Sequence, residues 1–314
     1  MTSRSQHAWA VSGILLLSAV WGGSFAAMKA LLDAGLSVGG MLATRFTLGA
    51  LGLALGALLL RIPFGRQGVQ DGLLLGLVLT PTFWLQADGL RYTTTAKSAF
   101  ITGLYVLFTP LVGLLFRLVP RRSHALGAAL AVGGLFLLVR DPTKPMGGWT
   151  FGDSETLLCA VLCGLHIVLT DRFSRRTSGW VLALVQVTVV AVLSWGLALL
   201  VPPVAHQGTR LGGLDGLLDV LRRPGVWIGL AYLAFVATAL AFYLMSTLQR
   251  HLSATEAAVA FSTEPVFAAL LAMSGLVPGV HEHLTAVQLT GGLVIVGAML
   301  MAELGPRLFR EEPA

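Results

Sequence analysis

Ten long runs of apolar residues constrain the fold of this chain more than any other feature of its sequence. A helix needs about 20 apolar residues to cross roughly 30 Å of hydrocarbon. The runs that reach or approach this length are 8–31, 39–60, 70–90, 97–117, 124–140, 151–170, 179–201, 225–248, 254–276 and 285–303. They are long and unalternating, which favours helices over the strands of a barrel. The sequence therefore predicts an all-α integral membrane protein with ten transmembrane helices.

The composition points to the same class of protein. Only 11% of the residues are charged and 55% are hydrophobic, whereas a soluble domain carries about 25% charged residues. The formal net charge is +6, but most cations lie in short loops between apolar runs, as membrane orientation requires. We therefore expect membrane lipid around most of the chain and no nucleic-acid partner.

The two cysteines, Cys159 and Cys163, lie four residues apart inside one apolar run. A disulfide framework or a zinc site needs more ligands at loop spacing. We interpret both as small buried helix residues, and we expect neither a bound metal nor a cofactor.

The distribution of lysine and arginine favours both termini in the cytoplasm, where loops carry an excess of cations. With the N-terminus inside, twelve of these residues fall on the cytoplasmic side and seven outside, although Arg222 and Arg223 oppose this orientation. Lys29 and Arg45 lie within apolar runs. The first run is longer than the apolar core of a signal peptide, so we expect it to be a retained helix.

Two connections between the runs are informative. Residues 141–148 include two prolines and two glycines, which is typical of a boundary, so we predict halves at 1–143 and 144–314. Residues 202–224 contain leucines at helical spacing with charged residues between them. This pattern fits a short helix lying at the membrane interface, and an ordinary structured loop fits equally well.

A weak internal repeat relates the two halves. Residues 99–115 read AFITGLYVLFTPLVGLL and residues 254–270 read ATEAAVAFSTEPVFAAL, with Pro110 and Pro265 at the same point. Each half holds five predicted spans, an odd number, so the second half must enter the membrane from the opposite side. Such inverted repeats are typical of alternating-access transporters, whose substrate site lies near the midplane between the halves.

Several short motifs give the chain a resemblance to a known family. They are Trp21-Gly22 followed by Lys29, the single Arg45 in LATRFTLGAL, the pair Gly152-Asp153, and Glu264-Pro265 in EPVFAALLA. In this order the motifs resemble the EamA family of the drug/metabolite transporter superfamily, in two copies over nearly the whole chain. The Gly-Glu pair usual after the proline-containing helix is absent here. The resemblance implies a ten-helix bacterial inner-membrane carrier, often an exporter of amino acids or other small metabolites.

Two ionisable residues deep in the predicted spans are the main candidates for substrate binding, because such a residue needs a partner or a function. Glu264 lies roughly 15 Å deep, near the midplane, directly before Pro265. It can bind a cationic group or a proton, or it can make a structural hydrogen bond to a neighbouring helix. Arg45 can attract an anionic group, or it can pair with Glu264 or a helix end.

Further candidates have a structural alternative each. Lys29 is a pathway gate or a snorkelling cation, and Glu256 shares a wide helix face with Glu264 or reaches the headgroups. Trp84 and Gln86 belong to a polar and aromatic patch that can hold an apolar substrate body, whereas tryptophan also populates interfacial belts.

The remaining candidates are lower in rank. His166 is a proton-coupling residue or a packed histidine, and Tyr105 and Tyr243 are candidate cavity residues. Pro81, Pro110 and Pro265 are expected to kink their helices, because proline removes a backbone hydrogen bond.

No Walker A, H-E-x-x-H or G-x-S-x-G pattern occurs in the chain, and these are the usual motifs of ATP hydrolysis, zinc peptidases and serine hydrolases. The inverted repeats predict a monomeric secondary transporter that works by alternating access, and the resemblance implies that it exports a small, amino-acid-like metabolite. A proton gradient drives it, or the substrate runs downhill. An integral-membrane enzyme that modifies lipids is the alternative.

Overall fold

The computed structural model describes residues 3–93, 95–140, 149–200, 218, 221–273 and 285–309, and within these ranges the chain is helical and contains no strand. The elements are α1 (Ser3–Asp33), α2 (Val38–Leu59), α3 (Arg66–Tyr92), α4 (Thr95–Gly103), α5 (Tyr105–Leu115), α6 (Arg122–Val139), α7 (Phe151–Ser174), α8 (Gly179–Leu200), α10 (Val226–Ala231), the π-helix η1 (Tyr232–Leu240), α11 (Ala241–Leu248), the 3₁₀ helix η2 (Gln249–His251), α12 (Ala254–Phe261), α13 (Glu264–Met273) and α14 (Ala286–Leu308). The predicted boundary at 143/144 and most of the 202–224 connection lie outside the described residues.

Eight helical segments are long and apolar enough to cross a membrane, by length and composition. They are Ser5–Asp33, Val38–Leu59, Arg66–Tyr92, Lys97–Leu115, Phe151–Ser174, Gly179–Leu199, Val226–His251 and Ala254–Leu271. The apolar parts of α6 and α14, Arg122–Leu138 and Ala286–Ala302, are shorter. The predicted all-helical class is confirmed, and eight of the ten predicted spans have a counterpart of full length. The count of ten stays a prediction.

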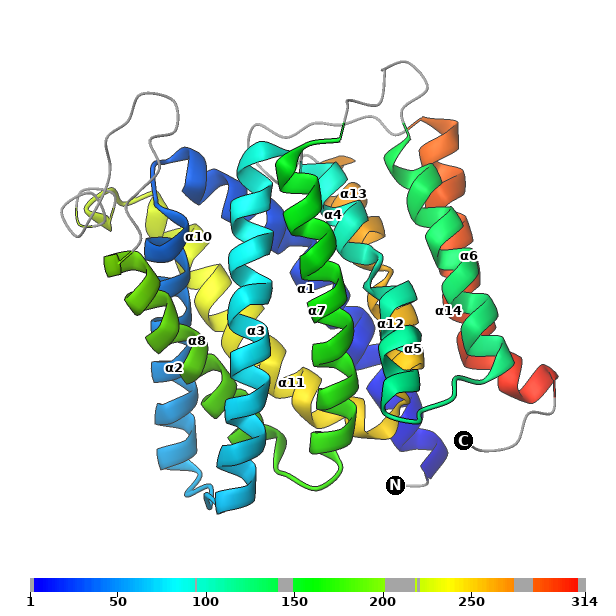
Figure 1. Ribbon diagram of the computed structural model, residues 1–314, viewed down its shortest axis with the longest axis horizontal. Helices are drawn as coiled ribbons and strands as arrows, with labels where there is room; N and C mark the ends of the chain where they lie inside the picture. The colour runs from blue at the N-terminus through cyan, green and yellow to red at the C-terminus, as the bar shows by residue number, and fades with distance from the viewer. Residues whose placement is uncertain are drawn as a thin grey trace.

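The helices α1 and α7, which begin the two halves, run in opposite directions. Near the start of α1, His7 Nδ1 lies 3.3 Å from the His251 carbonyl oxygen. Just after the end of α7, Arg175 donates a hydrogen bond to the Leu252 carbonyl at 3.0 Å. The start of α1 and the end of α7 therefore meet at the same end of the bundle. Both chain termini also lie there (Figure 1), and we call it the termini end.

The two halves are interleaved, so that helices of the first half pack mainly on helices of the second. The helix α1 contacts η1, α11, α12 and α13, while α2 contacts α8 and η1. In turn α3 contacts α7 and α8, and α6 lies along α14 at one edge of the bundle (Figure 1). One apolar core runs through both halves as a result.

Two of the long segments are interrupted near the middle of the bundle. The break between α4 and α5 falls at Leu104, six residues before Pro110, and the break between α12 and α13 falls at Ser262 and Thr263, directly before Glu264-Pro265. At the second break, the hydroxyl groups of Ser262 and Thr263 donate to the carbonyls of Val259 and Ala260 at 2.6 and 2.7 Å. Side chains thus satisfy backbone acceptors where the helix stops. Pro81 lies in the interior of α3, which continues through it.

Candidate functional site

A cavity lies where the middle parts of these helices meet. It holds about 650 Å³ of empty space, counting the part that is open to the outside. The helices α1 to α5 contribute from the first half, and α7, α11, α12 and α13 contribute from the second. The lining residues are Trp21, Ser24, Arg45, Leu79, Thr82, Phe83, Gln86, Thr102, Tyr105, Cys163, His166, Ile167, Phe242, Met245, Phe261 and Glu264.

Arg45 is fully buried and enters this cavity from α2. Its Nε donates to Thr238 Oγ1 at 2.8 Å and its Nη2 to the Ala237 carbonyl at 3.3 Å. The guanidinium carbon lies 4.8 Å from the centre of the Phe83 ring. These partners are neutral, and no carboxylate of the described chain forms an ion pair with Arg45. A guanidinium has five N–H donors, so Arg45 keeps both its charge and donor capacity for an anionic group.

Glu264 is the first residue of α13 and is only 7% exposed. The positive end of the α13 dipole lies at this position and favours a negative charge. The carboxyl group lies near Tyr105. The Tyr105 hydroxyl forms no hydrogen bond with any of the described residues. Tyr105 is itself the first residue of α5 and is 4% exposed. The two helix breaks therefore present a carboxyl and a phenol group to one cavity, with polar atoms that a ligand or water can satisfy.

The opposite charges of Arg45 and Glu264 are not paired with each other in the described structure. They line the same cavity from different halves of the chain. The described structure therefore contains no Arg45–Glu264 ion pair, which was the structural alternative for these residues. The cavity instead has a guanidinium and a carboxyl group that are each without an ionic partner among the described residues.

His166 lines the cavity, and a contact with Gln186 fixes the orientation of its ring. Its Nε2 lies 2.8 Å from Gln186 Oε1, and the Gln186 amide donates to Ser246 Oγ at 3.2 Å. With the amide in this orientation Nε2 donates to Gln186, and Nδ1 is an acceptor when the ring is neutral. Gln186 thus holds the His166 ring at the wall of the cavity.

Aromatic rings form the apolar wall of the cavity. The Trp21 ring centre lies 5.8 Å from that of Phe242 and 5.3 Å from that of Phe261, and Phe83 lies 6.0 Å from Phe242. The indole N–H of Trp21 donates to the Ala237 carbonyl at 3.0 Å. The predicted set of site residues omitted these four rings, although Phe83 belongs to the same polar and aromatic patch of residues 81–88 as Trp84 and Gln86, and Trp21 belongs to the Trp21-Gly22 motif. No local signal distinguishes Phe242 and Phe261 from ordinary core residues.

The structure brings five of the predicted site residues into this cavity, and they are Arg45, Gln86, Tyr105, His166 and Glu264. Cys163 also lines it, with its sulfur 3.9 Å from that of Cys159, so both thiols are free. Within the described ranges, no three His, Cys, Asp or Glu side chains gather as a metal site would need.

The other predicted site residues lie elsewhere. Lys29 pairs with Asp33 at 2.7 Å near the end of α1. Trp84 packs partly buried against the core. The Tyr243 ring lies 4.7 Å from that of Trp180. Glu256 caps the start of α12 and contacts His7 at the termini end.

A bundle of long apolar helices around a central cavity with charged side chains is the architecture of a multi-pass membrane transporter. Comparison with known families gives the same class. The chain matches the EamA-like transporter family over residues 8–140 and 150–303. It therefore belongs to the EamA-like transporter family, in two repeats.

Two individual proteins are similar to this chain. An uncharacterized transporter of Archaeoglobus fulgidus is 28% identical over 294 residues, which cover 93% of this chain and 85% of that protein. A crystal structure superimposes with a TM-score of 0.70 at 18% identity, covering 98% of this chain and 99% of the other. At that identity the second likeness concerns the fold alone.

Proposed function

We propose that this chain is a secondary transporter that exports a small, amino-acid-like metabolite by alternating access. The observation that carries the proposal is that Arg45 and Glu264 line one cavity without pairing with each other. A zwitterion matches this arrangement, with its carboxylate at Arg45 and its ammonium group at Glu264. Charge-assisted hydrogen bonds of this kind are the stronger ones in proteins.

The remaining wall supports a substrate with an apolar body. Trp21, Phe83, Phe242 and Phe261 line the same cavity as Arg45 and Glu264, and His166 adds a hydrogen-bond acceptor. An amino acid with an apolar or aromatic side chain is the class we favour.

The packing supports ten helices arranged as two inverted five-helix repeats. α1 and α7 run in opposite directions, and the contacts of one half have counterparts in the other. The contact of α3 with α7 corresponds to the contact of α11 with α1, and the contact of α3 with α8 corresponds to that of η1 with α2. The contacts of α2 with α8 and of α6 with α14 each join equivalent helices of the two halves. In such proteins one half rocks against the other around a fixed site. A single chain encloses the cavity, so we propose a monomer.

Transport in liposomes tests the proposal. Purified protein is reconstituted and assayed for counterflow of a labelled panel of amino acids, in the wild type and in Glu264→Gln, Arg45→Gln and Asp33→Asn. We expect flux of at least one amino acid. Removing either cavity charge should lower its apparent affinity about tenfold or more, since a hydrogen bond to a charged group contributes about 1.5–3 kcal/mol.

Asp33→Asn is the matched control, because it removes a carboxylate that is largely exposed, with 58% of its side chain accessible. It should transport like the wild type. Flux no greater than in empty liposomes across the panel would overturn the amino-acid-like substrate. Wild-type affinity in Glu264→Gln would overturn the assignment of the site.

A further inference from the structure

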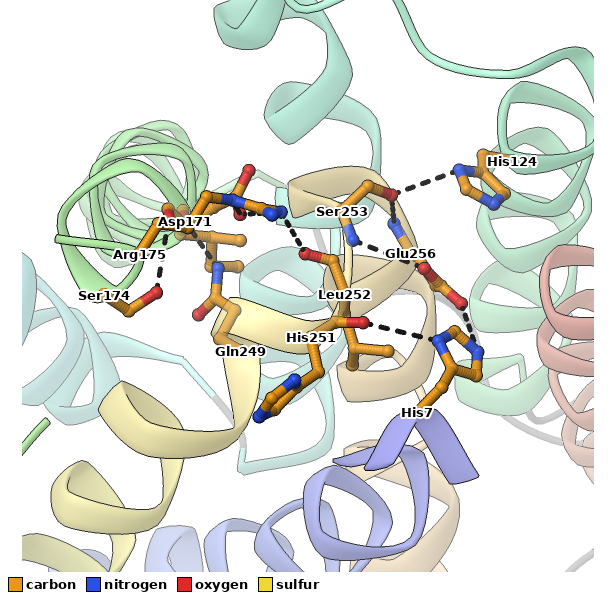
Figure 2. Close-up of polar contacts among 11 residues, drawn as sticks. His7, His124, Asp171, Ser174, Arg175, Gln249, His251, Leu252, Ser253 and Glu256 are labelled. Carbon is orange, nitrogen blue, oxygen red and sulfur yellow. Dashed lines mark hydrogen bonds and ion pairs between the residues drawn. The ribbon is translucent and has the colours of Figure 1, made fainter. Parts of the chain in front are cut away.

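At the termini end a group of polar residues closes the bundle below the cavity, and we call it the polar seam. It joins α1, α6, α7, η2 and α12 (Figure 2). Its members are His7, His124, Asp171, Ser174, Arg175, Gln249, His251, Leu252, Ser253 and Glu256. Gln249 donates to the Ile167 carbonyl at 2.6 Å, and Ile167 lines the cavity. The seam therefore lies directly between the cavity and the termini end.

Two histidines of the first half attach this seam to the second half. His124 Nδ1 lies 3.2 Å from Ser253 Oγ, and His7 Nε2 lies 3.1 Å from Glu256 Oε1. His124, Gln249 and Glu256 are buried, whereas the His7 side chain is 28% exposed. Separating α1 and α6 from η2 and α12 at this end would break the contacts of His7 and His124.

The His7 ring faces a hydrogen-bond acceptor at each of its two nitrogens. Nδ1 lies 3.3 Å from the carbonyl oxygen of His251, and Nε2 lies 3.1 Å from the carboxyl oxygen of Glu256 (Figure 2). A carbonyl and an ionised carboxylate only accept hydrogen bonds, whereas a neutral imidazole has a single N–H. Both contacts can form only when the pair holds one more proton. That proton sits either on the imidazole ring or on the carboxyl group.

We propose that closing the termini end takes up one proton, which is bound between His7 and Glu256. When this end opens, the two side chains separate and the proton is released to water. A difference in proton binding between two conformations makes their equilibrium depend on pH. With this site, the proton would be the coupling ion of the proposed transport. The proposal rests on the alternating access proposed above.

Other charged and titratable groups surround the pair. They are His124 on α6, Asp171 and Arg175 at the end of α7, and Arg250 and His251 on η2. Asp171 is paired with Arg175 at 2.7 Å, and Arg250 donates to the Thr247 carbonyl at 3.0 Å. The ring of His251 points away from His7 and contributes nothing to the contact, which uses the backbone of that residue (Figure 2). Among the titratable groups named here, all within the described residues, His124 also bridges the halves.

Distance measurements between two spin labels test the proton site without needing a substrate. The labels are placed at the exposed positions Gln6 and Ser178, on opposite halves of the termini end, after both native cysteines are changed to alanine. Distances are recorded by double electron–electron resonance in nanodiscs from about pH 5 to pH 8. For one bound proton, the ratio of closed to open molecules should fall by up to about tenfold for each pH unit of increase.

Four variants identify the residues that are responsible for the pH response of the distance. His7→Gln and Glu256→Gln should each abolish the pH dependence, and glutamine at 256 keeps the capping box of α12. His7→Lys should hold the closed distance throughout. His251→Gln is the matched control and should respond like the wild type.

Three results would overturn the proton site. They are a wild-type distance that is independent of pH, a pH response that survives in both His7→Gln and Glu256→Gln, and a response that disappears only in His124→Gln. These results differ from failure of the proposed function. If distances switch on adding amino acids but not with pH, alternating access stands and the proton site fails, whereas a single distance under every condition removes both.

Discussion

At the scale of the residue, Arg45 shows how a cation is held deep in the bundle without being neutralised. An arginine at the centre of a span costs about 2.5–3.5 kcal/mol on insertion scales. Here a hydroxyl, a backbone carbonyl and the faces of Phe46 and Phe83 surround the guanidinium. Neutral acceptors and ring faces lower the cost of burial while they leave the net charge in place. A structural arginine would more often have a carboxylate partner.

Replacing Arg45 by lysine tests whether the planar guanidinium matters. Lysine keeps the charge but loses the fork of donors and the stacking on Phe83. We expect the apparent substrate affinity to fall about tenfold, at the lower end of the contribution of one hydrogen bond to a charged group. Counterflow measured against substrate concentration provides the value.

Thr238→Val is the companion variant for this measurement. It removes only the acceptor of the Arg45 Nε hydrogen bond, so its effect should be a few-fold and smaller than that of Arg45→Lys. Equal affinities for the wild type and Arg45→Lys would rule out recognition by the guanidinium fork.

At the scale of the element, the contact between α3 and α7 explains the pair Gly152-Asp153. Asp153 forms a capping box with Thr150 at the start of α7, and its carboxylate accepts from Thr93 at 2.7 Å and Lys97 at 2.6 Å. It thereby fixes the start of α7 to the connection between α3 and α4. Gly152 allows the backbones to touch, because a Cβ there would lie 2.4 Å from the Gly89 carbonyl oxygen. Both residues have a structural role at this contact.

Gly152→Ala should therefore destabilise the protein. The neighbour of the added methyl group is backbone and cannot move aside, so the helices must separate, at a cost of about 1–3 kcal/mol. Unfolding by denaturing detergent, followed by circular dichroism, measures the loss.

The matched control is Gly133→Ala in α6, where an added Cβ meets nothing within 4 Å. There the higher helix propensity of alanine should leave stability unchanged or raise it by up to about 1 kcal/mol. Equal stabilities of the two variants would contradict the close α3–α7 contact.

At the scale of the whole molecule, the termini end carries both the polar seam and the cationic connection between α7 and α8. Asp71, near the start of α3, accepts hydrogen bonds from Arg176 at 3.0 Å and from Thr177 at 2.8 Å. The hydrogen bond to Asp71 raises the pKa of Arg176 above its ordinary value. The connection is thus held firmly and stays positively charged, as expected of a cytoplasmic loop.

Labelling of single cysteines tests the orientation that we propose, with both termini in the cytoplasm. Ser178→Cys lies at the termini end, and Pro224→Cys lies just before α10, next to Arg223, which donates to the Ala34 carbonyl beyond the end of α1. In spheroplasts of a bacterial host, with both native cysteines changed to alanine, an impermeant maleimide should modify only Pro224→Cys. Ser178→Cys should react after permeabilisation. The reverse pattern would place the termini outside.

The sequence alone was sufficient for the class of protein and for the position of most helices. Transfer of an apolar run into lipid is a local property, so the runs 39–60 and 179–201 correspond closely to α2 and α8. The two-repeat organisation is also confirmed, because the family matches residues 8–140 and again residues 150–303. Depth within a run pointed to Arg45 and Glu264, since an ionisable group there is costly whatever its neighbours are.

Only the tertiary structure decided which side chains meet. Arg45 bonds to Thr238, and His7 contacts Glu256, across separations of 193 residues and more. Such contacts depend on the rotation and crossing of helices, which no local pattern encodes. For the same reason, helical spacing allowed Glu256 to share one wide helix face with Glu264 or to reach the headgroups, and the structure places Glu256 in the polar seam and Glu264 in the cavity. The free energy of membrane insertion is a sum over the residues of each helix. A binding site is formed by helix faces that only packing brings together.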